Sequence, residues 1–191
     1  MYLRHLIVSL AIIGMALSGS ATAQTPDSLR FHRGQWGVEF NIANGFFGAG
    51  ALHFTSPTHA WLAVLDGEYA HDHASGPLLT SSNATSVAIE LGTRGYHSFS
   101  PRLYRVSTLG VSLNYSRQTA NGGPTLTAEG VGLFGDLGAT WLVTPHLGIG
   151  ARWRASVAYA HGKATVTGST TTSDIVTLSA ATVLLTGQIY F

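Results

Sequence analysis

The side chains that could serve as a nucleophile and a base lie close together in one segment. His97 is followed by Ser98 and Ser100, and an imidazole within hydrogen-bond reach of a serine hydroxyl can activate it for attack on an acyl group. In an extended chain, neighbouring side chains point to opposite faces, so His97 and Ser98 would face apart. The segment also offers no assignable carboxylate. We therefore predict no catalytic residues.

A second group of histidines has the residue types of a metal site. His71 and His73 flank Asp72, which would place two imidazoles on one side of an extended chain. A metal site needs three or four ligands in a fixed geometry, and no further ligand can be identified. We predict a solvated loop here, no metal ion and no cofactor.

The other ionisable side chains follow an alternating pattern. Asp66 and Glu68 alternate with apolar residues over 61–69, and Arg152 and Arg154 do so over 147–159. A period of two residues is typical of strands. The charges share the face opposite the apolar one, and we predict that they form an interior charge network: Glu39, Asp66, Glu68, Glu90, Arg94, Asp136, Arg152 and Arg154.

The composition excludes several classes of protein. The 191 residues include 10 Lys and Arg, 9 Asp and Glu and no Cys, for a net charge of +1. Only 10% are charged, against about 25% in a typical soluble domain. A mean hydropathy of +0.21 is too low for a bundle of membrane helices. Without an excess of basic charge, we predict no nucleic-acid partner.

The N-terminus has the pattern of a secretory signal peptide. Arg4 and His5 precede an apolar run over 6–17, and Ala21-Thr22-Ala23 supplies an A-x-A ending. The apolar run is too short for a membrane helix, which needs about 20 residues. We expect a signal peptide over 1–23 that is cleaved after Ala23, a short tail over 24–33 and one domain over 34–191.

Prolines mark a repeat in that domain. Pro57, Pro101 and Pro145 recur every 44 residues, which indicates a repeated unit, and proline belongs in turns or at strand starts. Each unit would hold two strands, and a shorter hairpin with an Asn44-Gly45 turn would precede Pro57. The predicted strands are 34–43, 46–55, 59–70, 84–97, 103–117, 126–143, 147–160 and 174–191.

Eight such strands predict an all-β fold, an eight-stranded antiparallel up-and-down β-barrel. A soluble barrel turns its apolar face inward, and a transmembrane barrel turns it outward. Charge is too scarce for a soluble surface, so we predict a transmembrane barrel with a small polar interior. The termini and proline turns would lie at one end of the barrel, and loops near 71–83, 118–125 and 161–173 would lie at the other.

The register of one hairpin predicts how the interior charges meet. A three-residue turn over 144–146 would place Asp136 opposite Arg154, with Arg152 as a diagonal neighbour. Two interpretations are open, a network that seals the lumen and a gated or narrow pore. We favour the seal, because an eight-stranded barrel has room for little beyond side chains.

Aromatic residues lie near both ends of the predicted strands. Trp61 and Tyr69 are eight residues apart, roughly 26 Å along a strand. At a tilt of about 40° this gives a height near the roughly 25 Å apolar band of such barrels. The predicted aromatic girdle consists of Trp36, Phe54, Trp61, Tyr69, Tyr104, Tyr115, Trp141 and Tyr159.

The last strand carries a further signature. Val183, Leu185, Ile189 and the final Phe191 share one face, interrupted by the small Gly187. This ending resembles the C-terminal strand of bacterial outer-membrane proteins, which the barrel-assembly machinery reads. The chain is similar to small barrels of the OmpX, OmpW and OmpA transmembrane-domain kind. The resemblance implies the bacterial outer membrane, where a monomer would contact lipid and lipopolysaccharide. It also implies that the termini and proline turns face the periplasm and that the longer loops face outward.

Three functional hypotheses are compatible with this architecture. We favour a non-enzymatic outer-membrane barrel with a structural or surface-interaction role. The second is a narrow channel or conduit for small apolar molecules, as the likeness to OmpW implies. The third is a lipid A-modifying enzyme, because His97 with Ser98 is similar to the His/Ser pairs of lipid A deacylases and palmitoyltransferases.

Overall fold

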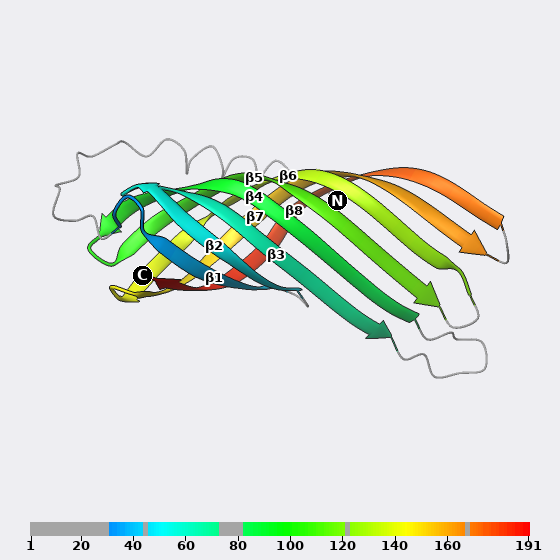
Figure 1. The fold of residues 1–191 in the computed structure, drawn as a ribbon, viewed down its shortest axis with the longest axis horizontal. Helices are drawn as coiled ribbons and strands as arrows, with labels where there is room; N and C mark the ends of the chain where they lie inside the picture. The colour runs from blue at the N-terminus through cyan, green and yellow to red at the C-terminus, as the bar shows by residue number, and fades with distance from the viewer. Residues whose placement is uncertain (1–30, 44–45, 73–81, 121–122, 167–168) are drawn as a thin grey trace.

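The computed structural model describes residues 31–43, 46–72, 82–120, 123–166 and 169–191. The expected signal peptide, most of the expected tail, the Asn44-Gly45 turn and His73 lie outside these residues. Eight strands follow one another along the chain (Figure 1): β1 (Trp36–Ala43), β2 (Phe46–Ser56), β3 (His59–Asp72), β4 (Ser82–Ser100), β5 (Leu103–Ala120), β6 (Thr125–Thr144), β7 (Leu147–Val166) and β8 (Ser169–Tyr190).

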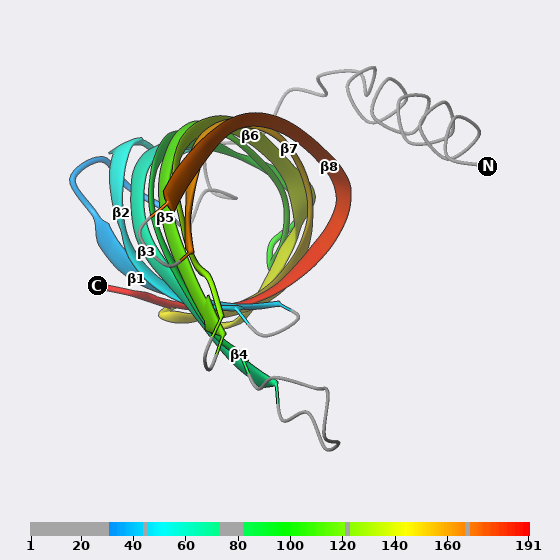
Figure 2. The same cartoon turned by 90° about the vertical axis from the view of Figure 1, so that its right-hand side faces the viewer.

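The strands close into a barrel. Each strand pairs antiparallel with its neighbour in sequence, and β1 pairs with β8 through residues 37–42 and 185–190. Figure 2 shows the resulting ring. The predicted eight-stranded up-and-down topology is confirmed. The described residues include no helix that is long and apolar enough to cross a membrane.

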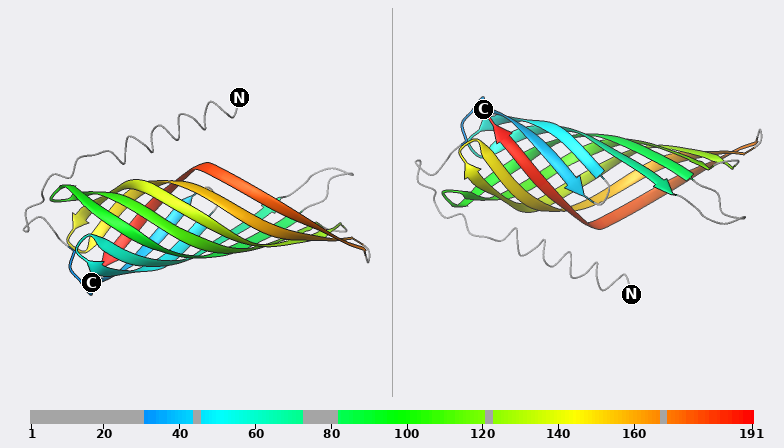
Figure 3. Two further views of the ribbon diagram at one scale, coloured as in Figure 1. Left: turned by 90° about the horizontal axis from the view of Figure 1, so that it is seen from above. Right: turned by 90° about the horizontal axis from the view of Figure 1, so that it is seen from below.

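The two ends of the barrel differ. One end, which we call the turn end, holds the C-terminus and the short connections after β2, β4 and β6. At the opposite end, which we call the loop end, β4 to β8 extend well past the short β1–β2 hairpin (Figure 3). β1 has 8 residues and β8 has 22. The wall is therefore much taller on one side than on the other.

One predicted loop is sheet instead. β7 continues to Val166 and β8 begins at Ser169, so most of the segment 161–173 is paired strand. Threonine favours extended backbone because its side chain is β-branched, and Thr165 lies opposite Thr170 at the end of the hairpin. The prediction of a solvated loop from Ser, Thr and Gly content was wrong here. β5 also extends to Ala120, into the loop predicted over 118–125.

The alternation of side chains separates an apolar outside from a filled inside. Along β5, Leu109, Leu113 and Tyr115 are exposed on the outer wall, whereas Thr108 is buried. A lumen of eight strands is just wide enough for side chains. The interior of this barrel is polar at mid-height and apolar toward the turn end, where Leu52 is among the buried residues.

Candidate functional site: the barrel interior

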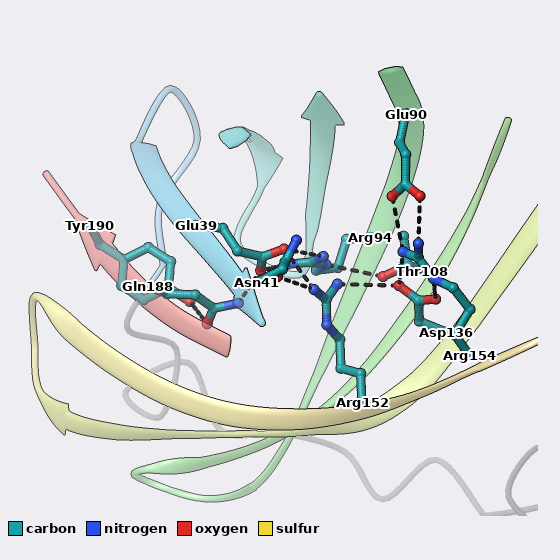
Figure 4. A network of polar contacts seen from close by, with 10 residues as sticks. All are labelled: Glu39, Asn41, Glu90, Arg94, Thr108, Asp136, Arg152, Arg154, Gln188 and Tyr190. Carbon is teal, nitrogen blue, oxygen red and sulfur yellow. Dashed lines mark hydrogen bonds and ion pairs between the residues drawn. The ribbon is translucent and has the colours of Figure 1, made fainter. Parts of the chain in front are cut away.

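A chain of ion pairs crosses the lumen, and Glu39 of β1 accepts hydrogen bonds from three other strands in it (Figure 4). Glu39 is fully buried. Its Oε1 accepts hydrogen bonds from Nη2 of Arg94 at 3.0 Å and from Nη2 of Arg152 at 2.7 Å. Its Oε2 accepts hydrogen bonds from Nη1 of Arg94 and, at 2.6 Å, from Nε2 of Gln188. One carboxylate thus joins β1 to β4, β7 and β8.

The chain continues through Asp136 of β6. This carboxylate accepts hydrogen bonds from Nη1 of Arg152 at 3.3 Å and from Nε of Arg154 at 2.7 Å. Arg154 also forms a bidentate pair with Glu90 of β4, in which Nη2 lies 3.0 Å from Oε2. Its guanidinium lies over the ring of Phe134, 4.4 Å from the centroid.

We call these six residues the cross-lumen network: Glu39, Glu90, Arg94, Asp136, Arg152 and Arg154. Three carboxylates alternate with three guanidinium groups, so the formal charges cancel. Planar guanidinium groups suit such bidentate contacts. The network joins non-adjacent strands, and most of its groups are buried inside the barrel.

Local sequence explains how the arginines fit. Asp136 lies directly opposite Arg154, in the predicted register, and Gly138 lies opposite Arg152. A Cβ at Gly138 would stand 2.8 Å from Cγ of Arg152 and 2.1 Å from the carbonyl oxygen of Ala151. Because Gly138 has no side chain, Arg152 can occupy this space.

Two members of the predicted interior charge network lie outside the cross-lumen network. Asp66 lines a pocket of about 210 Å³ together with Glu90 and Arg154, on the loop-end side of the ion pairs. Glu68 lies further along β3, where its Oε2 accepts a hydrogen bond from Ser86 at 3.2 Å. It lines a second pocket of about 370 Å³. The lumen is thus open toward the loop end, above the ion pairs.

An aromatic cluster fills the lumen on the turn-end side. Phe31, which precedes β1, packs its ring 4.5 Å from Phe54, 4.8 Å from Tyr96, 5.1 Å from Tyr104 and 5.0 Å from Tyr190, measured between centroids. All five side chains are buried. This cluster fills the lumen between the cross-lumen network and the turn end.

Phe54 and Tyr104 were predicted in the aromatic girdle, and that prediction was wrong. Both side chains point into the lumen, because they alternate with outward-facing residues such as Leu103. Proximity to a strand end does not reveal the face, which depends on register. The other predicted girdle residues are exposed on the outer wall: Trp36, Trp61, Tyr69, Tyr115, Trp141 and Tyr159.

Several interior residues were not predicted from the sequence. Asn41 accepts a hydrogen bond from Arg152 at 2.7 Å, and Thr108 accepts one from Nε of Arg94 at 3.0 Å. Gln188 accepts a 2.5 Å hydrogen bond from the Tyr190 hydroxyl, which links the aromatic cluster to the network. Gln188 and Tyr190 alternate with the apolar C-terminal signature, and this alternation is the signal that could have identified them.

The remaining predicted residues lie on the outer wall or at the turn end. The C-terminal signature residues are all exposed on the outer wall: Val183, Leu185, Ile189 and Phe191. His97 and Ser98 occupy opposite faces of β4, and the Ser98 hydroxyl donates to the carbonyl of Ser100 at 2.9 Å. Within the described part of the chain, no three His, Asp or Glu side chains are grouped to hold a metal ion.

Solved structures share this architecture. The outer membrane protein OprG from Pseudomonas aeruginosa matches with a TM-score of 0.59 at 12% identity, over 85% of this chain and 99% of that one. A major outer membrane protein from Thermus thermophilus matches with a TM-score of 0.55 at 13% identity, over 82% of this chain and 98% of that one. No family model and no curated protein matches the sequence.

These matches show that the chain has the fold of the small eight-stranded outer-membrane β-barrels. The resemblance predicted from the sequence is confirmed at that level. At 12–13% identity the likeness concerns the fold alone, so the role of this barrel has to be argued from its own side chains.

Proposed function

We propose that this protein is a closed, non-enzymatic outer-membrane barrel, a monomer with a structural or surface-interaction role. The observation that carries the proposal is the cross-lumen network. Glu39, Arg94, Arg152 and Asp136 are essentially fully buried and join strands on opposite sides of the ring. With the aromatic cluster beneath them, they fill the lumen from mid-height to the turn end with protein side chains.

The outer wall supports a place in lipid. Large apolar side chains such as Trp61, Leu109 and Leu185 are 59%, 69% and 59% exposed, which is unfavourable in water and favourable against lipid chains. Trp36 is exposed at the turn end of β1, and Tyr159 is exposed in the loop-end half of β7, as expected for side chains at two membrane interfaces. The contacts proposed for this wall are outer-membrane lipid and lipopolysaccharide.

The proposed orientation follows from the two ends. Short turns and the C-terminus would face the periplasm, and the tall sheet formed by β4 to β8 would project outside the cell. β8 starts with a polar stretch that includes Thr171 and Thr172, both exposed. This projecting sheet is the surface proposed for contacts with other molecules. The apolar face ending at Phe191 is the segment proposed to engage the assembly machinery.

Planar-bilayer recording tests the closed barrel. The purified protein should give no stable single-channel steps. A triple variant, Phe31→Ala with Arg152→Ala and Arg154→Ala, removes side chains from the cross-lumen network and the aromatic cluster and should give steps if it folds. A heat-dependent shift in gel migration verifies folding of each sample. Stable steps from the unaltered protein would refute the proposal.

A second candidate, a conduit for small apolar molecules, is favoured by a notch in the wall. β1 pairs with β8 only over residues 185–190. On the loop-end side of these residues, no described strand pairs with the edge of β8 that faces away from β7. The pocket of about 210 Å³ reaches this edge through Ala43, Phe46 and Leu184. A small apolar molecule entering from the loop end would meet a partly apolar pocket beside a gap in the wall.

Uptake measurements distinguish the conduit from the closed barrel. Liposomes that contain the protein should take up a small apolar dye no faster than empty liposomes if the barrel is closed. Faster uptake that is lost in Leu184→Trp, which fills the pocket, would favour the conduit. The third hypothesis, a lipid A-modifying enzyme, is tested by mass spectrometry of lipid A with and without expression. A changed acyl pattern would support it.

A further inference from the structure

The outer wall has a pocket at the turn end that the proposed role does not use. Its volume is about 260 Å³, and it lies where the β2–β3 turn meets the longer β4–β5 hairpin. β3 begins at His59, opposite Gly95, whereas β4 continues to Ser100. β4 therefore extends past its neighbour, and the step in the wall leaves a hollow.

Side chains that can carry positive charge surround this hollow. His97 lies directly opposite Arg105 across β4 and β5, and His59 lines the hollow from β3. Gly95 of β4 pairs with Ser107 of β5, and both lie between His59 and the His97–Arg105 pair. The middle of the pocket therefore bears no side chain larger than a serine. We call this group the basic pocket: His59, Gly95, His97, Arg105 and Ser107.

The surroundings of the basic pocket are apolar. Trp61, two residues along β3, is 59% exposed, and Phe99, two residues along β4, is 63% exposed. Leu103, two residues from Arg105 on β5, is 37% exposed. A charged group on a lipid-facing wall is costly deep in the hydrocarbon and tolerated near the interface. The basic pocket is therefore at the depth of lipid headgroups.

We propose that the basic pocket binds the phosphate group of a glycerophospholipid in the leaflet facing the turn end. This inference rests on the proposed membrane orientation. The planar guanidinium of Arg105 presents a fork of donors that matches phosphate, and imidazole N–H groups and the Ser107 hydroxyl can donate as well. Thr58 helps to orient the His59 ring, since its Oγ1 lies 3.0 Å from Nδ1. The acyl chains would pack against Trp61 and Leu109, which lie on the loop-end side of the pocket.

A phosphate occupant agrees with both the charge and the shape of the pocket. A neutral lipid tail would gain nothing from Arg105 and two imidazoles, and a bulky protein segment would not enter a hollow of about 260 Å³. Basic pockets at membrane surfaces recognise lipid headgroups in the same way.

Native mass spectrometry of the full-length barrel in detergent tests the proposal. The probes are phosphatidylglycerol, diacylglycerol with the same acyl chains, and inorganic phosphate. Phosphatidylglycerol should remain bound, and diacylglycerol should not. Arg105→Gln should lower the lipid-bound fraction about tenfold, because it removes the charge-assisted hydrogen bonds. Circular dichroism verifies that each variant is folded.

Two further variants distinguish binding in the pocket from nonspecific attraction between the lipid and basic residues. Gly95→Val keeps every charge and fills the hollow, so it should also reduce lipid retention. Its added Cβ would meet only the Ser107 hydroxyl closely, at 3.2 Å, and a hydroxyl can rotate away. Arg117→Gln removes an exposed arginine from the loop-end part of the same strand and should leave retention unchanged.

Several results would overturn the proposal. Equal retention of diacylglycerol would show that the acyl chains alone bind. Displacement of the lipid by inorganic phosphate at an equal concentration would indicate a free-phosphate site. A similar loss in Arg105→Gln and Arg117→Gln would show nonspecific attraction. Channel activity of the lumen would refute the closed barrel and leave this outcome unchanged, so the two proposals fail separately.

Discussion

Glu39 and Arg94 are 55 positions apart in the chain and meet inside the barrel through both carboxylate oxygens and both terminal guanidinium nitrogens. They belong to β1 and β4, which do not pair in the sheet. Backbone hydrogen bonds hold neighbouring strands together, whereas this ion pair constrains the distance across the ring. The cross-lumen network therefore links strands that make no backbone hydrogen bonds with one another.

Glu39→Gln tests the carboxylate that pairs with both Arg94 and Arg152. The amide keeps the shape but leaves Arg94 and Arg152 buried without their shared negative charge, which should cost about 3–5 kcal/mol of unfolding free energy. Urea unfolding in detergent micelles measures it. The matched control is Glu129→Gln, at an exposed position of β6, which should change stability by less than about 0.5 kcal/mol. Equal effects of the two substitutions would contradict a structural role for Glu39.

Arg154→Ala tests the other end of the network. The substitution removes the partner of Glu90 and one partner of Asp136, so two carboxylates lose compensation inside the lumen. The midpoint of thermal unfolding in detergent should fall clearly below that of the unaltered protein. Arg117→Ala, which removes an exposed arginine, serves as the control. An unchanged midpoint for Arg154→Ala would exclude a structural role of the ion pairs.

Gly138→Ala tests the space around Arg152. The added Cβ would press on the backbone of Ala151 and on the Arg152 side chain, and such overpacking costs about 1–3 kcal/mol. Gly187→Ala makes the same chemical change at a strand position where nothing lies within 4 Å of the new Cβ. It should be neutral or stabilising. Similar losses in both variants would mean that Gly138 has no special role.

Phe31→Ala tests the aromatic cluster. Loss of a buried phenylalanine ring that contacts four others costs about 3–5 kcal/mol when the site cannot collapse, and it opens space at the turn end. Phe99→Ala, at an outer position that is 63% exposed, is the control and should be mild in detergent. Chemical unfolding of both variants compares them directly. A mild effect of Phe31→Ala would show that the segment before β1 is dispensable for the seal.

The fold was predictable because its signals are periodic. Alternation over two residues and the recurrence at Pro57, Pro101 and Pro145 defined eight strands and placed eight charged side chains on interior faces. The local register at 144–146 also gave the pairing of Asp136 with Arg154. These are relations within one strand or one hairpin.

Relations across the ring were not predictable in this way. The sequence places Glu39 and Arg94 on interior faces, but which carboxylate meets which arginine depends on strand tilt and closure. Phe31 precedes the first strand and has no alternation to reveal its burial. The faces of Phe54 and Tyr104 were also not predictable, since an aromatic residue near a strand end can belong either to the outer girdle or to the lumen.

The His161–Asp174 pair tests the projecting sheet through its pH dependence. Hydrogen bonds from His161 at 2.8 Å and Tyr159 at 2.9 Å hold the pKa of Asp174 below its ordinary value of 3.8. Because the pKa of Asp174 is lower in the folded state than in the unfolded state, the pair stabilises the fold at pH values above the unfolded pKa. This contribution is lost as the pH falls through the folded pKa. The pair is exposed, so solvent screening keeps the effect small. Carboxyl-carbon NMR should show the Asp174 pKa rising toward 3.8 in His161→Gln. An unchanged titration would show that β7 and β8 do not form this contact in solution.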